Sequence, residues 1–149
     1  MSLEKRIQAD VVTAMKDGNK FEVTTLRSLN AQIKDERIKL RPSREIEDTD
    51  VVNVLITAAK RRKEALELYQ QGGREDLVEK EQNELKIIQR YLPEQLSEQD
   101  INSEIDAIIS QIGATSISDL GKVMGQAMGR LKGKADGKLV QNLVRQRLS

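Results

Sequence analysis

The sequence contains no cysteine and no histidine. These absences exclude disulfide bonds, metal sites built on thiolate or imidazole ligands, a cysteine nucleophile and a histidine general base. Carboxylates and lysines remain, so the composition disfavours catalysis without excluding it. We therefore expect no catalytic residue, no metal site and no cofactor in this chain.

Aromatic residues, prolines and long apolar runs are also scarce. The 149 residues include two tyrosines, one phenylalanine, no tryptophan and two prolines, whereas 33% are charged. This composition favours helices over sheets. No segment approaches the roughly 20 apolar residues that a membrane span needs. The early charges at Glu4, Lys5 and Arg6 do not fit a signal peptide. We expect a cytoplasmic protein without a membrane partner.

The net charge of +1 conceals a strong asymmetry along the chain. Residues 1–92 carry a charge of +1, residues 93–120 carry six acids and no base, and residues 121–149 carry seven bases and the single acid Asp136. An acidic block is thus followed directly by a basic one. Such polarity indicates an electrostatic function for the C-terminal part.

Apolar residues recur at helical spacing in four segments before Pro93; in the first of them the apolar stripe is Leu3, Ile7, Val11 and Met15. We expect the third and fourth helices to form a long antiparallel hairpin, because Gly72-Gly73 separates them. The expected helices start and stop at local signals: the first runs from a Ser2 cap to Gly18, the second from about Lys20 to Arg41-Pro42-Ser43, the third from a cap at Asp48 or Thr49 to Gly72, and the fourth from about Glu75 to Leu92.

Three shorter helices are expected after Pro93, capped by Ser97, Ser116 and Asp136, and Gly113 is expected to end the first of them. The proline, the segment Leu92–Leu96 that resembles a linker, and the change in charge coincide. The sequence therefore predicts an all-α protein with an N-terminal four-helix domain, residues 1–92, and a small three-helix domain, residues 93–149.

Gly121, Gly125 and Gly129 lie four residues apart and so share one face of the sixth expected helix. We call them the glycine face. Each glycine costs a helix about 1 kcal/mol relative to alanine. Two interpretations are open: a tight contact with another helix, which packing behaviour favours, or the close approach of a nucleic-acid backbone.

The stretch Lys132-Gly-Lys-Ala-Asp-Gly-Lys138, which we call the lysine loop, precedes the last helix. Ammonium groups, backbone N–H groups and the helix dipole would together favour a phosphate there. The spacing is not that of a Walker loop, and no strand precedes it. A solvated turn is an equally open interpretation. The candidate nucleic-acid-binding residues are of two kinds: those that would supply charge are Lys122, Arg130, Lys132, Lys134 and Lys138, and those that would allow close access to the backbone are Gly125, Gly129 and Gly133.

Two other charged segments favour ordinary surface roles. Residues 60–63, Lys-Arg-Arg-Lys, spread around a helix, and Glu64 and Glu67 can pair with Lys60 and Lys63. The acids of the fifth expected helix do not form a paired-carboxylate site. We expect them to be mainly solvated, although they could contact the basic helices.

Residues 93–149 contain no aromatic residue. Binders of single-stranded nucleic acid usually stack bases on aromatic side chains. A nucleic-acid partner would here be held through shape and phosphate contacts, which suits folded RNA.

Several motifs resemble the GatB/YqeY family over nearly the whole chain. They are Arg27-Ser-Leu29, Arg74-Glu-Asp-Leu77, Tyr91-Leu-Pro-Glu-Gln-Leu-Ser97, Gly121-Lys-Val-Met-Gly125 and Lys132 to Val140. The resemblance is stronger to the small free-standing YqeY-like proteins. It implies a helical N-terminal domain joined to a three-helix domain similar to the tail of the B subunit of glutamine-dependent aspartyl/glutamyl-tRNA amidotransferase.

In that enzyme the tail helps to hold the tRNA, while the chemistry belongs to other domains and subunits. The resemblance therefore implies a tRNA-binding or tRNA-associated accessory module that lacks the catalytic units. A label of carbon–nitrogen ligase with glutamine as amide donor would be inherited from the larger enzyme. The alternative is a protein-interaction adaptor that uses the hairpin of residues 48–92. A component of the amidotransferase or of an aminoacyl-tRNA synthetase is its expected partner.

Overall fold

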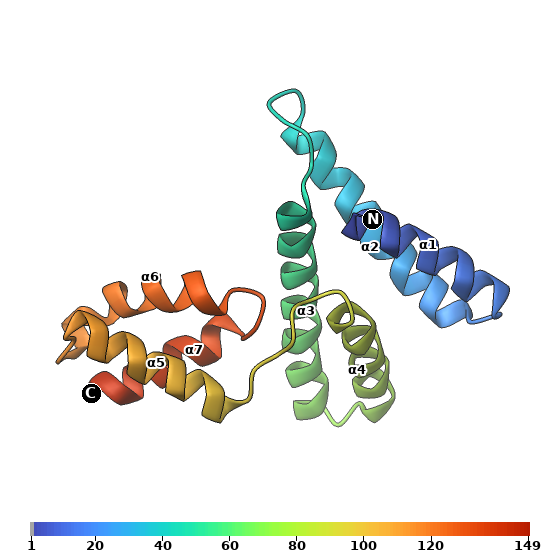
Figure 1. The fold of residues 1–149 in the computed structure, drawn as a ribbon. Coiled ribbons are helices and arrows are strands. Elements are labelled where there is room, and N and C mark those ends of the chain that lie inside the picture. The colour runs from blue at the N-terminus through green and yellow to red at the C-terminus, as the bar shows by residue number, and fades with distance from the viewer. Residues whose placement is uncertain (1) are drawn as a thin grey trace. The chain divides into compact units, whose positions relative to one another are not determined.

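The computed structural model describes residues 2–149, which form α-helices joined by short turns and one 3₁₀ helix (Figure 1). The predicted all-α class is confirmed. The helices are α1 (Leu3–Lys16), α2 (Lys20–Leu40), α3 (Asp48–Gln71), α4 (Glu75–Gln89), α5 (Glu98–Ile112), the 3₁₀ helix η1 (Ile117–Asp119), α6 (Leu120–Leu131) and α7 (Gly137–Leu148).

The chain divides into two compact units, Met1–Leu92 and Pro93–Ser149. In the first unit, α1 and α2 form one antiparallel pair and α3 and α4 form another (Figure 1). Leu26, Leu29, Ile33 and Leu55 are fully buried between them. One expectation from the α1 pattern is wrong: Met15 is 53% exposed, and Ala14 takes the buried position.

The cap of helix α3 lies one residue before Asp48 and two before Thr49, the two predicted caps. Glu47 is the N-cap residue, and it forms a capping box with Asp50. Asp50 also accepts two hydrogen bonds from the guanidinium of Arg44, at 2.6 and 2.7 Å. The Arg44 hydrogen bonds, followed by the Glu47 backbone N–H, lower the pKa of Asp50 to about 2. An ionised Asp50 therefore ties the loop after α2 to the start of α3.

The basic run in α3 does not pair within its own helix as expected. Arg62 points toward α4, where its Nε donates to Glu84 at 2.7 Å and lies 3.7 Å from Glu81. In the described residues, Lys60 and Lys63 form no ion pair with Glu64 or Glu67. Oppositely charged side chains of α3 and α4 thus pair across the hairpin.

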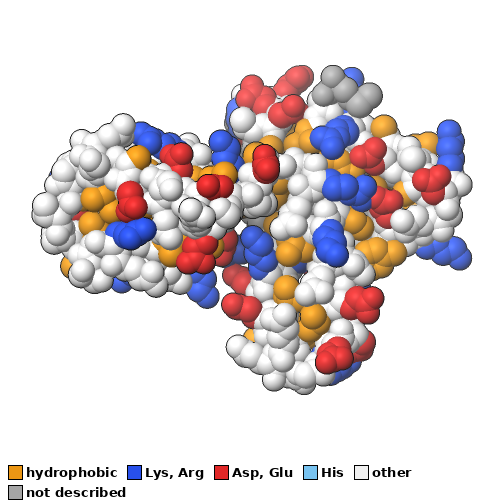
Figure 2. Space-filling model, turned by 60° about the horizontal axis from the view of Figure 1, so that its bottom comes forward, with side chains coloured by type: hydrophobic (Ala, Val, Ile, Leu, Met, Phe, Trp, Pro, Cys, Tyr) orange, Lys and Arg blue, Asp and Glu red, His pale blue; other side chains and the backbone are white. Residues whose placement is uncertain are grey.

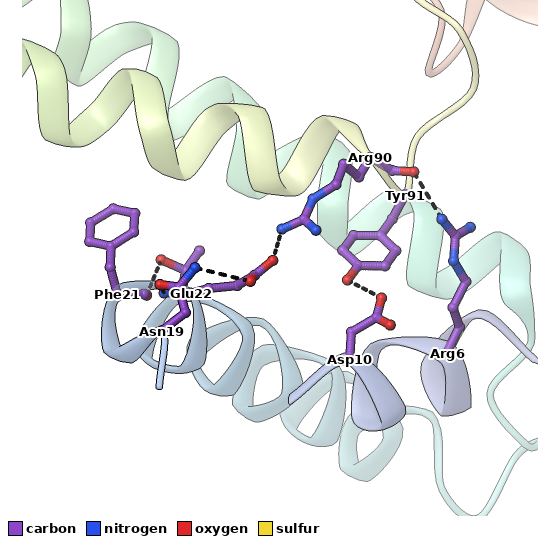
Figure 3. Close-up of polar contacts among 8 residues, drawn as sticks. Arg6, Asp10, Asn19, Phe21, Glu22, Arg90 and Tyr91 are labelled. Carbon is purple, nitrogen blue, oxygen red and sulfur yellow. Dashed lines mark hydrogen bonds and ion pairs between the residues drawn. The ribbon is translucent and has the colours of Figure 1, made fainter. Parts of the chain in front are cut away.

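Tyr91 fastens the end of α4 to α1 (Figure 3). Its ring is 5% exposed, and its hydroxyl donates to the Asp10 carboxylate at 2.5 Å. The Arg6 guanidinium lies 5.0 Å from the ring centroid, and Arg90 pairs with Glu22 on α2. Burial, and then the hydrogen bond to Asp10, raise the pKa of the Tyr91 hydroxyl. The folded structure therefore favours the protonated, neutral form of the Tyr91 hydroxyl.

Replacing Tyr91 by phenylalanine should destabilise the first unit by about 1 kcal/mol, because the buried hydrogen bond to Asp10 is lost. Urea unfolding followed by far-UV circular dichroism measures this change. Tyr69→Phe is the control, because the described contacts leave the Tyr69 hydroxyl without a hydrogen bond. Since the folded pKa of Tyr91 is raised from 10.0, the difference between wild type and Tyr91→Phe should shrink above pH 10. Equal effects of the two substitutions would contradict the role of Asp10.

The second unit packs α5, α6 and α7 around one apolar core (Figure 1). Ser97 caps α5 by accepting from the Asp100 N–H, and Gly113 ends this helix with a left-handed φ of 68°. Both were predicted. The core consists of Ile101, Ile105, Ile108, Val123, Ala127, Leu131, Val140, Leu143, Val144 and Leu148.

Candidate nucleic-acid interface

The glycine face lies on the side of α6 that is turned away from the core of the second unit. Val123, Ala127 and Leu131 are at most 1% exposed, whereas Gly121, Gly125 and Gly129 are exposed. A Cβ atom built on any of these glycines would meet nothing within 4 Å. Within the second unit, therefore, no other helix packs tightly against this face. Nothing within the unit requires glycine on this face.

The start of α6 is anchored by a cap of the predicted type. Asp119 accepts from the backbone N–H groups of Thr115 at 3.0 Å and Ser116 at 3.3 Å. These bonds, with a smaller contribution from Lys122, lower the pKa of Asp119. The capping box of Ser116 and Asp119 encloses the 3₁₀ turn η1, which leads directly into α6. Lys122 is exposed next to the glycine face, as the candidate site requires.

The lysine loop connects α6 to α7, and residues 137 and 138 already belong to α7. The side chains of Lys132, Lys134 and Lys138 are exposed. Asp136 occupies the N-cap position of α7, but its side chain forms no capping hydrogen bond, contrary to expectation. It therefore does not compete for the first N–H groups of the helix. The loop brings three cations to the positive end of a helix dipole.

Gly133 differs from the role predicted for it. It is buried, has a left-handed φ of 79°, and its carbonyl accepts from the side-chain amide of Gln95 at 2.6 Å. A backbone conformation that other residues rarely adopt explains the glycine. Gly133 therefore allows the backbone turn of the lysine loop. Because it is buried, it does not let a partner approach the backbone closely.

Arg130, another candidate nucleic-acid-binding residue, already contacts α5. Its guanidinium donates to Gln111 at 2.7 Å and lies 3.8 Å from Glu104, both on α5. Arg147 of α7 pairs with Asp106 at 3.1 Å. The acids of α5 were expected to be mainly solvated, yet two of them contact the basic helices. Because all four side chains remain about half exposed, each pair contributes no more than about 1 kcal/mol.

The segment before α5 was predicted to be a linker, but it contacts the lysine loop. Besides the bond from Gln95 to Gly133, the Leu96 N–H donates to the Lys134 carbonyl at 2.9 Å. Sequence reasoning missed these residues because nothing in their spacing reports a partner so far along the chain. The motif around Pro93, noted for its family resemblance, was the available signal.

A separate cleft of about 430 Å³ lies between α2 and α3 in the first unit. Asp35, Glu36, Lys39 and Arg61 contribute side chains of both signs to its lining. On the face shown in Figure 2, acidic and basic side chains are likewise interspersed. The cleft therefore offers no charge preference comparable with that of the lysine loop.

Among residues 2–149, no cluster of three or more carboxylates is arranged to hold a metal ion. None of the described helices is both long and apolar enough to cross a membrane.

Comparison with known proteins identifies the family. The family model described as Yqey-like protein matches residues 4–148. The chain therefore belongs to the YqeY-like family, as the motifs predicted.

Relatives occur in fungi. A protein of Schizosaccharomyces pombe whose name calls it uncharacterized is 30% identical over 96 residues, which are 64% of this chain and 76% of that protein. The "Altered inheritance of mitochondria protein 41, mitochondrial" of Pyrenophora tritici-repentis is 33% identical over 86 residues, 58% of this chain and 46% of the relative. Its namesake from Eremothecium gossypii is 30% identical over 113 residues, 73% and 60% respectively.

The chain thus spans less than two thirds of the length of each of the two relatives that are named mitochondrial. Those names do not agree with the expected cytoplasmic localisation, which stays a prediction.

Proposed function

We propose that this chain is a tRNA-binding accessory module whose second unit contacts the phosphate backbone through the glycine face and the lysine loop. One observation carries the proposal: the glycine face is bare. Gly125 and Gly129 are exposed, and a Cβ at either position would meet nothing. Gly125 in the middle of α6 and Gly129 in its last turn together cost the helix up to about 2 kcal/mol relative to alanine. A partner that must approach the backbone closely accounts for this cost.

The charge of the lysine loop indicates the chemical class of the partner. Lys132 and Lys134 are exposed at the C-terminal end of α6, and Lys138 lies in the first turn of α7. In the described part of the chain none of these three lysines forms an ion pair, unlike Arg130 and Arg147. Unpaired ammonium groups at a helix N-terminus attract phosphate. An anionic backbone therefore fits this surface better than a neutral helix does.

The form of the nucleic acid follows from what the second unit lacks. Residues 93–149 have no aromatic side chain on which to stack an exposed base. Binding through backbone and shape suits folded RNA. The resemblance of this unit to the tail of the amidotransferase B subunit supports tRNA as that RNA. An accessory role follows, because the ligase chemistry implied by the resemblance belongs to other domains and subunits.

Titration of fluorescently labelled tRNA with the purified chain tests the proposal. We expect binding that weakens with salt, with a slope of log K against log salt of about −2 to −4 for three or four phosphate contacts. A duplex DNA of equal length is the control for non-specific attraction. Absence of binding at low salt would refute the proposal.

The adaptor role of the α3–α4 hairpin is tested by capture from lysate with and without nuclease. Loss of all partners after nuclease supports the RNA-binding role. Protein partners that persist would favour the adaptor.

A further inference from the structure

The segment Pro93–Leu96 holds the lysine loop by its backbone. The Gln95 side-chain amide donates to the Gly133 carbonyl at 2.6 Å and to the Pro93 carbonyl at 2.8 Å. The next residue, Leu96, donates its backbone N–H to the Lys134 carbonyl at 2.9 Å. Two consecutive carbonyls of the loop are thus turned toward this segment and bound there.

The loop is also closed on itself. The N–H groups of Lys134 and Ala135 both donate to the Leu131 carbonyl, at 2.9 and 3.1 Å. Gly133, with φ of 79°, makes this tight reversal possible. With its carbonyls facing inward, the loop exposes the side chains of Lys132 and Lys134. These backbone hydrogen bonds therefore fix the positions from which the two lysine side chains extend.

Such an arrangement affects binding through entropy. A loop that is already ordered loses less conformational freedom when a ligand orders it, which strengthens binding without any new contact. Gln95 bonds the loop at the residue between the two lysines. Its own side chain is exposed and lies outside the apolar core, so its removal should leave the fold of the unit intact.

We propose that Gln95 is a positioning residue that pre-orders the lysine loop for phosphate binding. This inference rests on the proposed RNA-binding function. Gln95 acts through Lys132 and Lys134 and need not contact the RNA itself. Leu96 contributes the second bond through its backbone, which a side-chain substitution does not remove.

The test combines Gln95→Ala and Gln95→Glu with the double variant Lys132→Gln/Lys134→Gln in a mutant cycle. Loss of one hydrogen bond to the loop should weaken tRNA binding about threefold to tenfold. Gln95→Glu keeps the size of the side chain but cannot donate to the Gly133 carbonyl, so it should weaken binding at least as much. Gln99→Ala, an exposed glutamine in the first turn of α5, is the matched control and should bind like wild type.

The cycle separates positioning from a general structural effect. In the Lys132→Gln/Lys134→Gln background, Gln95→Ala should change affinity less than about twofold, because the groups it positions are gone. The same fold-loss in both backgrounds would overturn the positioning role, as would wild-type affinity of Gln95→Ala. If the wild-type chain does not bind tRNA, the proposed function fails and this inference fails with it. If the wild-type chain binds tRNA and Gln95→Ala binds it equally well, this inference fails while the proposed function stands.

Discussion

Reversing the charge of Lys132, Lys134 and Lys138 to glutamate should weaken tRNA binding at least about a hundredfold. Each lysine can supply a charge-assisted contact worth about 1.5 kcal/mol or more, so three lost contacts exceed the 2.7 kcal/mol of a hundredfold change. Repulsion between the new carboxylates and phosphate adds to the loss. All three side chains are exposed, so the fold should tolerate the change.

A matched control distinguishes this surface from the effect of net charge. Lys16, Lys34 and Lys80 are exposed lysines of the first unit, and their replacement by glutamate changes the net charge by the same amount. We expect this control to weaken binding only severalfold, through long-range electrostatics that salt screens. Fluorescence anisotropy at several salt concentrations measures both variants. Equal losses in the two variants would remove the lysine loop from the interface.

Helix ends were predictable where the signal is local. The caps at Ser2 and Ser97 and the stop at Gly113 depend on residues within one turn, and the structure has all three. The start of α3 was missed because Glu47, Asp48 and Asp50 offer neighbouring caps that a pattern cannot rank. The end of α4 was placed at Leu92, but the chain tightens into i→i−3 bonds after Gln89 as Pro93 approaches.

The candidate site was predictable only as a set of residues. Composition and spacing placed the lysines and the glycine face on the last two helices. They could not reveal that Arg130 pairs with Glu104, or that Gln95 reaches Gly133, because these partners lie 26 and 38 residues apart without any periodic signal. Whether the glycines were packed or bare depended on where α5 and α7 lie. Each of these features depends on contacts between segments that are far apart in the sequence, and residue spacing does not encode such contacts.

Replacing Gly121, Gly125 and Gly129 together by alanine should stabilise the second unit by about 2 kcal/mol, with Gly121 contributing least because it lies in the first turn. No side chain has to move, since a Cβ at each position meets nothing within 4 Å. The same three methyl groups should weaken tRNA binding about tenfold, because they keep the partner's backbone away from α6. Stability and affinity should therefore change in opposite directions.

Hydrogen exchange of the α6 amides is the suitable measure of stability, because the tyrosines and the phenylalanine all lie in the first unit and do not report on the second. Gly113→Ala is the control of opposite sign: its φ of 68° disfavours alanine, so this variant should lose about 1 kcal/mol. A triple variant that is more stable and binds tRNA like wild type would show that nothing approaches the glycine face closely. A triple variant that is less stable would show that the face is occupied within the protein. We expect the triple variant to be more stable and to bind tRNA more weakly. Such a result would indicate that the glycines are needed for a partner outside the chain, because alanine at these positions favours the helix itself.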